Sequence, residues 1–252
     1  MNLDEKRADP SLEAERLIAL ANAANISVRL LGGVAISLLY KGQLPPALQR
    51  EYKDLDFVCT RDHARRWSEV LESNGYKSDV QFNSIHGSQR LLHFNNSTGG
   101  QLDTFVEEFS MCQQLELKTR LGILESTLTP IDLLLTKLQI FEINDKDLVD
   151  AIALFLKYAP GDSPTNSLEK ERVKSIVGSH WGWYTTLIDN LEKVKQRVFL
   201  TALSNFQKEV AIENIDGLLQ LIVDCPKSIK WKTRAKVGRR MPWYDLPEEV
   251  EF

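Results

Sequence analysis

The sequence feature that most constrains the fold is a glycine pair between a short apolar strand and a helix. Residues 28–31 (VRLL) are a strand candidate, Gly32-Gly33 interrupts it, and residues 34–42 (VAISLLYKG) are typical of a helix. A doubly wound sheet would continue with strands and helices in regular alternation. The later strand candidates cluster instead, at residues 76–82, 89–95 and 101–109. We therefore predict an α+β fold in which flanking helices cover a small mixed β-sheet.

Two further segments of the N-terminal half have clear helix signals. Residues 11–24 have Ser11 as a candidate N-cap, and residues 62–74 have Asp62 as a candidate N-cap and Gly75 as a stop. Both helices are predicted to flank the sheet.

The composition changes at Thr129, where the chain becomes helical. Thr129, Pro130 and Asp132 combine an N-cap, a proline at the first helical position and an acid three residues after the cap. Helices are expected over most of residues 130–159, then a linker at 160–167. Further helices are expected over residues 168–178 and 184–224, the latter with Leu191, Val194, Val198, Phe206 and Val210 on one apolar face. The predicted division is an α/β domain with an N-terminal helix (1–128), a helical domain (129–224) and a basic, aromatic tail (225–252).

Charge and cysteine usage restrict the class of protein. The chain has 252 residues and a net charge of −4, so the whole molecule is not a general polyanion binder. Its three cysteines are an odd number, lie far apart and form no CxxC, which favours a reducing compartment. The N-terminus is polar and acidic, unlike a secretory signal, and no apolar stretch approaches the roughly 18 residues of a spanning helix. We expect a cytoplasmic protein without a membrane partner.

The strongest chemical motif is the pair Asp54 and Asp56 in the strand candidate of residues 54–59 (DLDFVC). Side chains at i and i+2 of a strand point to the same face, so both carboxylates would share one side. Two acids this close repel unless a cation lies between them, and Mg²⁺ binds carboxylate oxygens together with substrate phosphates. The alternative is a solvated strand face, where Lys53 softens the repulsion.

Gly32 and Gly33 form a second candidate site. Glycine lets the backbone approach a ligand, and a helix N-terminus attracts phosphate. The alternative is a tight strand-to-helix turn. Because the chain has neither GxGxxG nor GxxxxGK[ST], dinucleotide folds and P-loop NTPases are poor candidates.

Asp103 lies in another strand candidate, QLDTFV. A third carboxylate converging on the pair would complete a site for two Mg²⁺ ions, which stabilise both the attacking and the leaving oxygen of a phosphoryl displacement. The alternative is an exposed strand acid, since Glu107 and Glu108 follow closely.

The order LGGVAISLL (31–39), REYKDLDFV (50–58) and QLDTFV (101–106) resembles the nucleotidyltransferase superfamily of the DNA polymerase β type. Within it, the chain is similar to the AbiEii-like branch, toxins of type IV toxin–antitoxin systems. Arg50 before the Asp-x-Asp pair contributes to this likeness, as does the segment 129–155 with Lys137 and Lys146-Asp147-x-x-Asp150. The resemblance covers roughly residues 28–156.

The resemblance implies an enzyme that moves NMP from an NTP to an acceptor hydroxyl of RNA, protein or a small molecule. Asp54, Asp56 and Asp103 would be the catalytic and metal-binding residues, with Mg²⁺ or Mn²⁺ as cofactor. The nucleotide-binding residues would be Gly32, Gly33, Arg50, Lys137 and Asp147. A toxin-like role would add an antitoxin protein as partner. The alternative function is a catalytically silent module of the same fold for nucleotide sensing or protein binding.

The residues of the second half can also be interpreted without the family resemblance. Lys137 falls at the edge of an apolar helical arc, where lysine commonly extends to solvent. Asp145 or Asp147 is a candidate helix cap, and Arg50 is able to pair with Glu51.

The tail is the second unusual segment. Residues 227–240 hold seven bases and no acid, which leaves the rest of the chain at −11 against the net −4. Together with Trp231, Trp243 and Tyr244, these bases are suited to an RNA backbone and its bases. The alternative is that the tail docks on the acidic body or on a second subunit.

Overall fold

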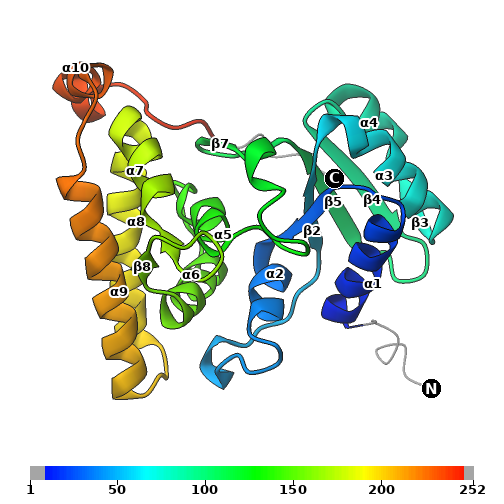
Figure 1. The fold of residues 1–252 in the computed structure, drawn as a ribbon, viewed down its shortest axis with the longest axis horizontal. Coiled ribbons are helices and arrows are strands. Elements are labelled where there is room, and N and C mark those ends of the chain that lie inside the picture. The colour runs from blue at the N-terminus through cyan, green and yellow to red at the C-terminus, as the bar shows by residue number, and fades with distance from the viewer. Residues whose placement is uncertain (1–8, 247–252) are drawn as a thin grey trace. The chain divides into compact units, whose positions relative to one another are not determined.

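In the computed structural model, which describes residues 9–246, the predicted strands pair into one five-stranded sheet of mixed direction (Figure 1). Its order is β1-β2-β5-β4-β3. β2 and β5 are parallel and the other neighbours antiparallel. The predicted α+β fold with a helical C-terminal region is thereby confirmed. The strands are β1 (Val28–Leu31), β2 (Leu55–Cys59), β3 (Tyr76–Ser78), β4 (Arg90–Asn95) and β5 (Gln101–Val106).

The chain divides into two compact units. The first comprises the chain up to Gln43 together with Arg50–Phe109 and Glu116–Thr129, and it contains the sheet. The second comprises Leu44–Gln49, Ser110–Leu115 and the chain from Pro130 onward. The short strands β6 (Glu108–Ser110) and β7 (Gln114–Glu116) lie where the chain passes between the units.

One face of the sheet is covered by α3 (Arg61–Ser73). The fully buried Trp67 of α3 meets the ring of Phe57 edge-on at 5.5 Å, and its indole N–H donates to the hydroxyl of Thr104 at 3.0 Å. Phe57 and Thr104 are register partners on β2 and β5, so they share this face. Because strand side chains alternate, Asp56 and Asp103 belong to the opposite face.

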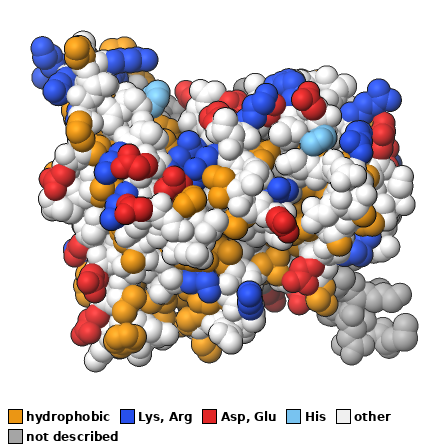
Figure 2. Space-filling view, viewed as in Figure 1, with side chains coloured by type: hydrophobic (Ala, Val, Ile, Leu, Met, Phe, Trp, Pro, Cys, Tyr) orange, Lys and Arg blue, Asp and Glu red, His pale blue; other side chains and the backbone are white. Residues whose placement is uncertain are grey.

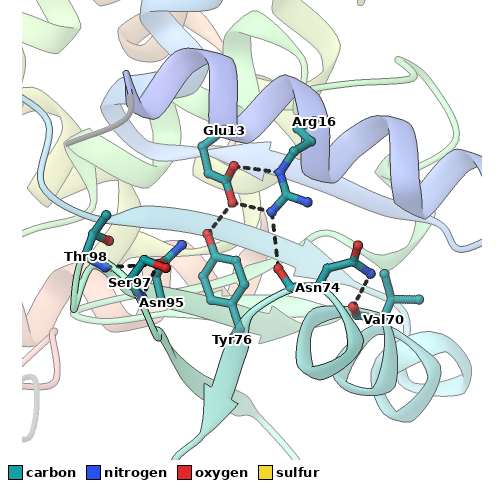
Figure 3. Close-up of polar contacts among 8 residues, drawn as sticks. All are labelled: Glu13, Arg16, Val70, Asn74, Tyr76, Asn95, Ser97 and Thr98. Atoms are coloured by element: carbon teal, nitrogen blue, oxygen red, sulfur yellow. Dashed lines mark hydrogen bonds and ion pairs between the residues drawn. The ribbon is translucent and has the colours of Figure 1, made fainter. Parts of the chain in front are cut away.

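A polar network attaches α1 (Pro10–Ala23) to the edge of the sheet (Figure 3). Glu13 accepts hydrogen bonds from Arg16 at 2.6 Å and from the hydroxyl of Tyr76 at 2.9 Å. Arg16 also donates to the backbone oxygen of Asn74 at 3.4 Å. Beneath this network α1 buries Ala14, Leu17, Ile18 and Ala21. The apolar stripe thus packs α1 on the unit, and the network fixes its direction.

The predicted strand over residues 76–82 is wrong beyond Ser78. Asp79 caps a short helix, α4 (Val80–His86), by accepting a hydrogen bond from the backbone N–H of Phe82 at 2.9 Å. The expected strand 101–109 is also interrupted, because Glu107 has a positive φ of 67°. At α1 the N-cap is Asp9, whose side chain accepts from the N–H of Ser11, and not Ser11 itself. At α4 and α1, a capping side chain that hydrogen-bonds the backbone determines where the helix begins.

The second unit is helical. Leu191, Val194 and Val198 of α8 (Trp181–Leu200) are fully buried, as predicted, but Phe206 is 73% exposed. The single expected helix 184–224 is interrupted at residues 201–204, where Ser204 forms a capping box with Gln207 and starts α9. No helix within residues 9–246 is both long and apolar enough to cross a bilayer. The helices are α5 (Pro130–Leu138), α6 (Asp145–Lys157), α7 (Lys170–Ser179), α8 (Trp181–Leu200), α9 (Asn205–Asp224) and α10 (Ile229–Val237), with the short strands β8 (Pro160–Gly161) and β9 (Leu168–Glu169).

A fully buried histidine lies between the sheet and α3. The Nε2 atom of His93 is 2.8 Å from the hydroxyl of Ser68, and its Nδ1 atom has no hydrogen-bond partner within the described residues. Burial lowers the pKa of His93 to about 4, although Glu72 and Asp103 act in the opposite direction. The ring is therefore neutral in the folded protein at pH 7.

We predict that His93 makes the protein lose stability in mild acid. In the unfolded chain His93 binds a proton below its ordinary pKa of about 6.5. In the folded chain it stays neutral down to about pH 4. The free energy of unfolding should fall by up to roughly 3 kcal/mol across that window. Urea denaturation from pH 7 to pH 4 measures this fall. His93→Gln should reduce its slope with pH and the exposed His180→Gln should not; equal slopes in both variants would contradict the assignment.

Candidate active site

The centre of the candidate site is a pair of carboxylates on adjacent strands. Asp56 of β2 is the register partner of Asp103 of β5. Register partners on neighbouring strands point to the same face, and the strands lie about 4.8 Å apart. Asp54 precedes β2 by one residue and is exposed, whereas Asp103 is almost fully buried. The fold therefore brings together two acids that are distant in the sequence.

Gly32 closes one side of this pair. It begins α2 (Gly32–Leu39) with a positive φ of 74°, directly after Leu31, the antiparallel register partner of Asp56. A Cβ atom at Gly32 would overlap Oδ2 of Asp56. Glycine is thus required twice here, for the left-handed backbone and for the space beside the carboxylate.

Gly33 lies under Arg50. A Cβ atom at Gly33 would overlap the guanidinium of Arg50 and come within 2.7 Å of the ring of Tyr52. The guanidinium stacks over the Tyr52 ring at 4.5 Å and donates to the backbone oxygen of Glu51 at 3.3 Å. The start of α2 therefore combines a helix N-terminus with a cation, and both attract phosphate.

The two oxygens of Asp103 are held by residues that sequence reasoning did not select. Arg90 donates to Oδ1 and the side-chain amide of Gln101 donates to Oδ2, each at 2.7 Å. The Arg90 guanidinium also lies over the rings of Phe82 and Phe105, at 5.8 and 5.3 Å. Gln101 could have been found from the i, i+2 alternation along β5, but Arg90 requires the register of β4 against β5.

The donor chemistry of the three carboxylates suits a divalent cation, because Mg²⁺ and Mn²⁺ prefer hard oxygen ligands. The space that a side chain at Gly32 would fill is consistent with a ligand beside Asp56. The side chains are nevertheless not arranged as a complete set of metal ligands. Among residues 9–246, no group of three or more His, Cys, Asp or Glu side chains is placed to hold a metal ion. An ion bound by Asp103 would share that carboxylate with Arg90 and Gln101.

Lys137 and Asp147 belong to the second unit and contact each other there. The ammonium of Lys137 lies 2.8 Å from Asp147 and 3.0 Å from Asp150, and its side chain is 13% exposed. Burial would lower the pKa of Lys137, but the two carboxylates outweigh it and raise the pKa well above its ordinary value. Lys137 therefore does not extend to solvent, and this cluster carries a net charge of −1.

The cap of α6 is Asn144 and neither of the two expected aspartates. Its side-chain oxygen accepts from the backbone N–H of Asp147 at 3.0 Å, and its amide donates to the Asp147 carboxylate at 2.9 Å. Asp145 instead pairs with Arg197 at 2.6 Å. Asp147 is thus fixed from two sides, by the helix cap and by Lys137.

We predict that Gly32→Ala is more damaging than Gly42→Ala. Both glycines have a φ near +75°, but Gly42 has open space where a Cβ would lie. Each substitution costs about 1–2 kcal/mol for the backbone, and Gly32→Ala adds the displacement of Asp56, about 1–3 kcal/mol. Urea denaturation of both variants measures the difference. Equal losses would show that Gly32 does not crowd Asp56.

A second prediction concerns the ion pair between Arg90 and Asp103. Arg90→Gln removes the cation from a mostly buried carboxylate and should lower the free energy of unfolding by about 1–3 kcal/mol. Arg65→Gln is the control, because Arg65 is highly exposed and pairs with Glu69 on the surface of α3; its effect should stay within about 0.5 kcal/mol. The idea fails if chemical denaturation gives the two variants the same stability.

Comparison with protein families identifies a match over the first part of the chain. The model of a protein family described as "Uncharacterised nucleotidyltransferase" matches residues 6–149, which is more than half of the chain and includes the carboxylates, both glycines, Arg50, Lys137 and Asp147. No curated protein matches the chain. On this evidence the chain belongs to that family of nucleotidyltransferases.

Proposed function

We propose that the protein is a Mg²⁺-dependent enzyme that transfers NMP from an NTP to an acceptor hydroxyl and releases pyrophosphate. The observation that carries the proposal is the pairing of Asp56 with Asp103 on one face of the sheet, next to the glycine start of α2. Family membership supports the general reaction. The metal, the acceptor and the individual residue roles are our inference.

In this reaction the acceptor oxygen forms a bond to the α-phosphorus, and the bond from that phosphorus to pyrophosphate breaks with its electron pair. The N-terminus of α2, with Gly32 and Gly33 leaving the backbone accessible, would seat the triphosphate. Arg50 would offset part of its negative charge. The acceptor proton would pass to Asp103, whose orientation Arg90 and Gln101 fix.

Asp54, Asp56 and Asp103 would hold the metal ion. When bound, Mg²⁺ supplies positive charge where negative charge develops on the phosphoryl oxygens. Arg90 and Gln101 already counter part of the mutual repulsion of the carboxylates at Asp103.

Lys137 and Asp147 enter the proposal differently from the sheet residues. Lys137 would meet a nucleotide phosphate only by sharing its charge with Asp147 and Asp150. The assignment of Lys137 and Asp147 to nucleotide binding stays a prediction of the family resemblance. The toxin-like role and the antitoxin partner rest on the AbiEii-like resemblance alone.

The second candidate function is a catalytically silent module that binds nucleotide or protein. One observation favours it: both oxygens of Asp103 are already engaged, as a carboxylate with a purely structural role would be. The two functions differ in whether bound NTP is ever consumed.

We predict that NTP binding depends on Mg²⁺ and on the Asp-x-Asp pair. Calorimetry with each NTP, with and without Mg²⁺, should give metal-dependent binding. Asp54→Asn with Asp56→Asn should weaken it at least about tenfold, or roughly 1.4 kcal/mol. Glu15→Gln with Asp62→Asn removes the same charge from exposed positions and should bind as wild type does.

Unchanged binding by the Asp54/Asp56 variant would refute the proposed site. Binding that is lost in that variant, without transfer of label from α-labelled NTP to any RNA or protein of a lysate, would favour the silent module.

A further inference from the structure

The basic segment of residues 227–240 forms a distinct part of the second unit. It comprises Lys227, the N-cap residue Ser228, α10 (Ile229–Val237) and the 3-10 helix η4 (Gly238–Arg240). α10 packs beside α7 and α8, and basic side chains gather at its place in the space-filling view, at the upper left (Figure 2). None of the 14 residues is acidic.

Three of the seven bases are used within the protein. Lys227 donates to the backbone oxygens of Ile222 and Cys225, at 2.6 and 2.7 Å. Arg234 donates to the backbone oxygen of Gly238 at 2.7 Å, and Arg239 pairs with Asp189 at 2.7 Å. The Arg239–Asp189 ion pair is a contact of the expected kind, between the tail and an acid of the body, whereas Lys227 and Arg234 bond to backbone oxygens close to them in the sequence.

The other four bases are directed outward. Their side chains are exposed and make no hydrogen bond or ion pair with other residues of the range 9–246: Lys230, Lys232, Lys236 and Arg240. At 100° per residue, Lys232 and Lys236 lie one turn apart on one side of the exposed Ile229. Lys230 lies on the other side of Ile229 around the helix. Trp231 and Arg234 occupy the opposite, less exposed side of the helix. We call the four bases the α10 cationic face.

The nearby aromatic rings are already engaged with one another. Trp231 meets Tyr184 edge-on at 5.2 Å, and the indole N–H groups of Trp231 and Trp243 are both buried. Tyr244 stacks on Phe141 at 3.7 Å, and the Arg239 guanidinium lies over Trp243 at 5.1 Å. These rings hold the segment in place, so they are not available as a platform for nucleic-acid bases.

We propose that the α10 cationic face binds the phosphate backbone of RNA, independently of sequence. Four exposed cations in a segment that contains no acidic residue match a polyanion, and the engaged aromatics remove base stacking as a source of specificity. A bilayer fits less well, because α10 has nine residues and exposes two large apolar side chains, Ile229 and Val237, with the polar Thr233 between them. The choice of RNA rests on the proposed function, since RNA supplies acceptor hydroxyls.

The salt dependence of binding follows from the number of contacts. Four phosphate contacts on a single strand give a slope of log K against log salt of about −2.8, and one remaining contact gives about −0.7. Non-specific affinity of this kind corresponds to a Kd of roughly 10⁻⁴–10⁻⁶ M. Removal of three lysines should therefore weaken binding about 100-fold near 0.1 M salt.

The test is fluorescence anisotropy of a labelled oligouridylate, without NTP, over about 50–200 mM salt. Lys230→Gln, Lys232→Gln and Lys236→Gln are combined in one variant of the full chain. The control combines Lys41→Gln, Arg65→Gln and Lys77→Gln, three exposed bases of the first unit. The α10 variant should lose affinity and slope as stated, while the control, with the same net charge, should bind as wild type does.

Equal affinity of the two variants, or no binding by wild type, overturns the proposal. Tighter binding to phosphatidylserine vesicles than to RNA, lost in the same α10 variant, also overturns it in favour of a lipid surface. The Asp54/Asp56 variant separates the two proposals. If it binds RNA but not NTP, and the α10 variant binds NTP but not RNA, both stand. If the wild-type protein does not bind NTP, the proposed function fails, and the anisotropy measurement alone decides whether the α10 cationic face binds RNA.

Discussion

Electrostatic repulsion between two acids on neighbouring strands is the constraint to which the rest of the first unit responds. The register sets Asp56 beside Asp103, where two negative charges in a partly buried site destabilise each other. Arg90 and Gln101 donate hydrogen bonds to Asp103, and a helix N-terminus lies next to Asp56, so both carboxylates are partly compensated. Each of these groups also suits a phosphate-bearing substrate. A site that tolerates its own charges is thus already prepared for a nucleotide.

The sequence was sufficient for those parts of the site that depend on local backbone. Strand alternation around Asp56 and the glycine pair before α2 are short-range signals, and both predicted the elements found. The mixed sheet followed from the clustering of strand candidates. Arg90 was missed because its role arises from pairing between β4 and β5, and no local pattern encodes that register. The helix at α4 was missed because one capping bond at Asp79 decided between strand and helix.

The second unit shows the same limit for charged side chains. Position on a helical wheel suggested that Lys137 reaches solvent, but two aspartates on the following helix retain it. The break between α8 and α9 depends on a four-residue capping box and not on the apolar spacing that crosses it. In the basic tail, Arg239 pairs with an acid of the body, whereas Lys230, Lys232, Lys236 and Arg240 are exposed. Composition cannot separate the two groups, because only the helix phase assigns each base to a side.

The position of Arg90 has a mechanical consequence. Its guanidinium lies over Phe82, which belongs to α4, while it holds the carboxylate of Asp103. α4 buries no residue completely and is tied to β4 by two hydrogen bonds between Asn83 and the backbone of Leu92. A short surface helix that buries no residue completely is therefore linked, through Arg90, to the charge balance of the buried Asp103. A displacement of α4 would reach the sheet as a change in electrostatic potential without any movement of the strands.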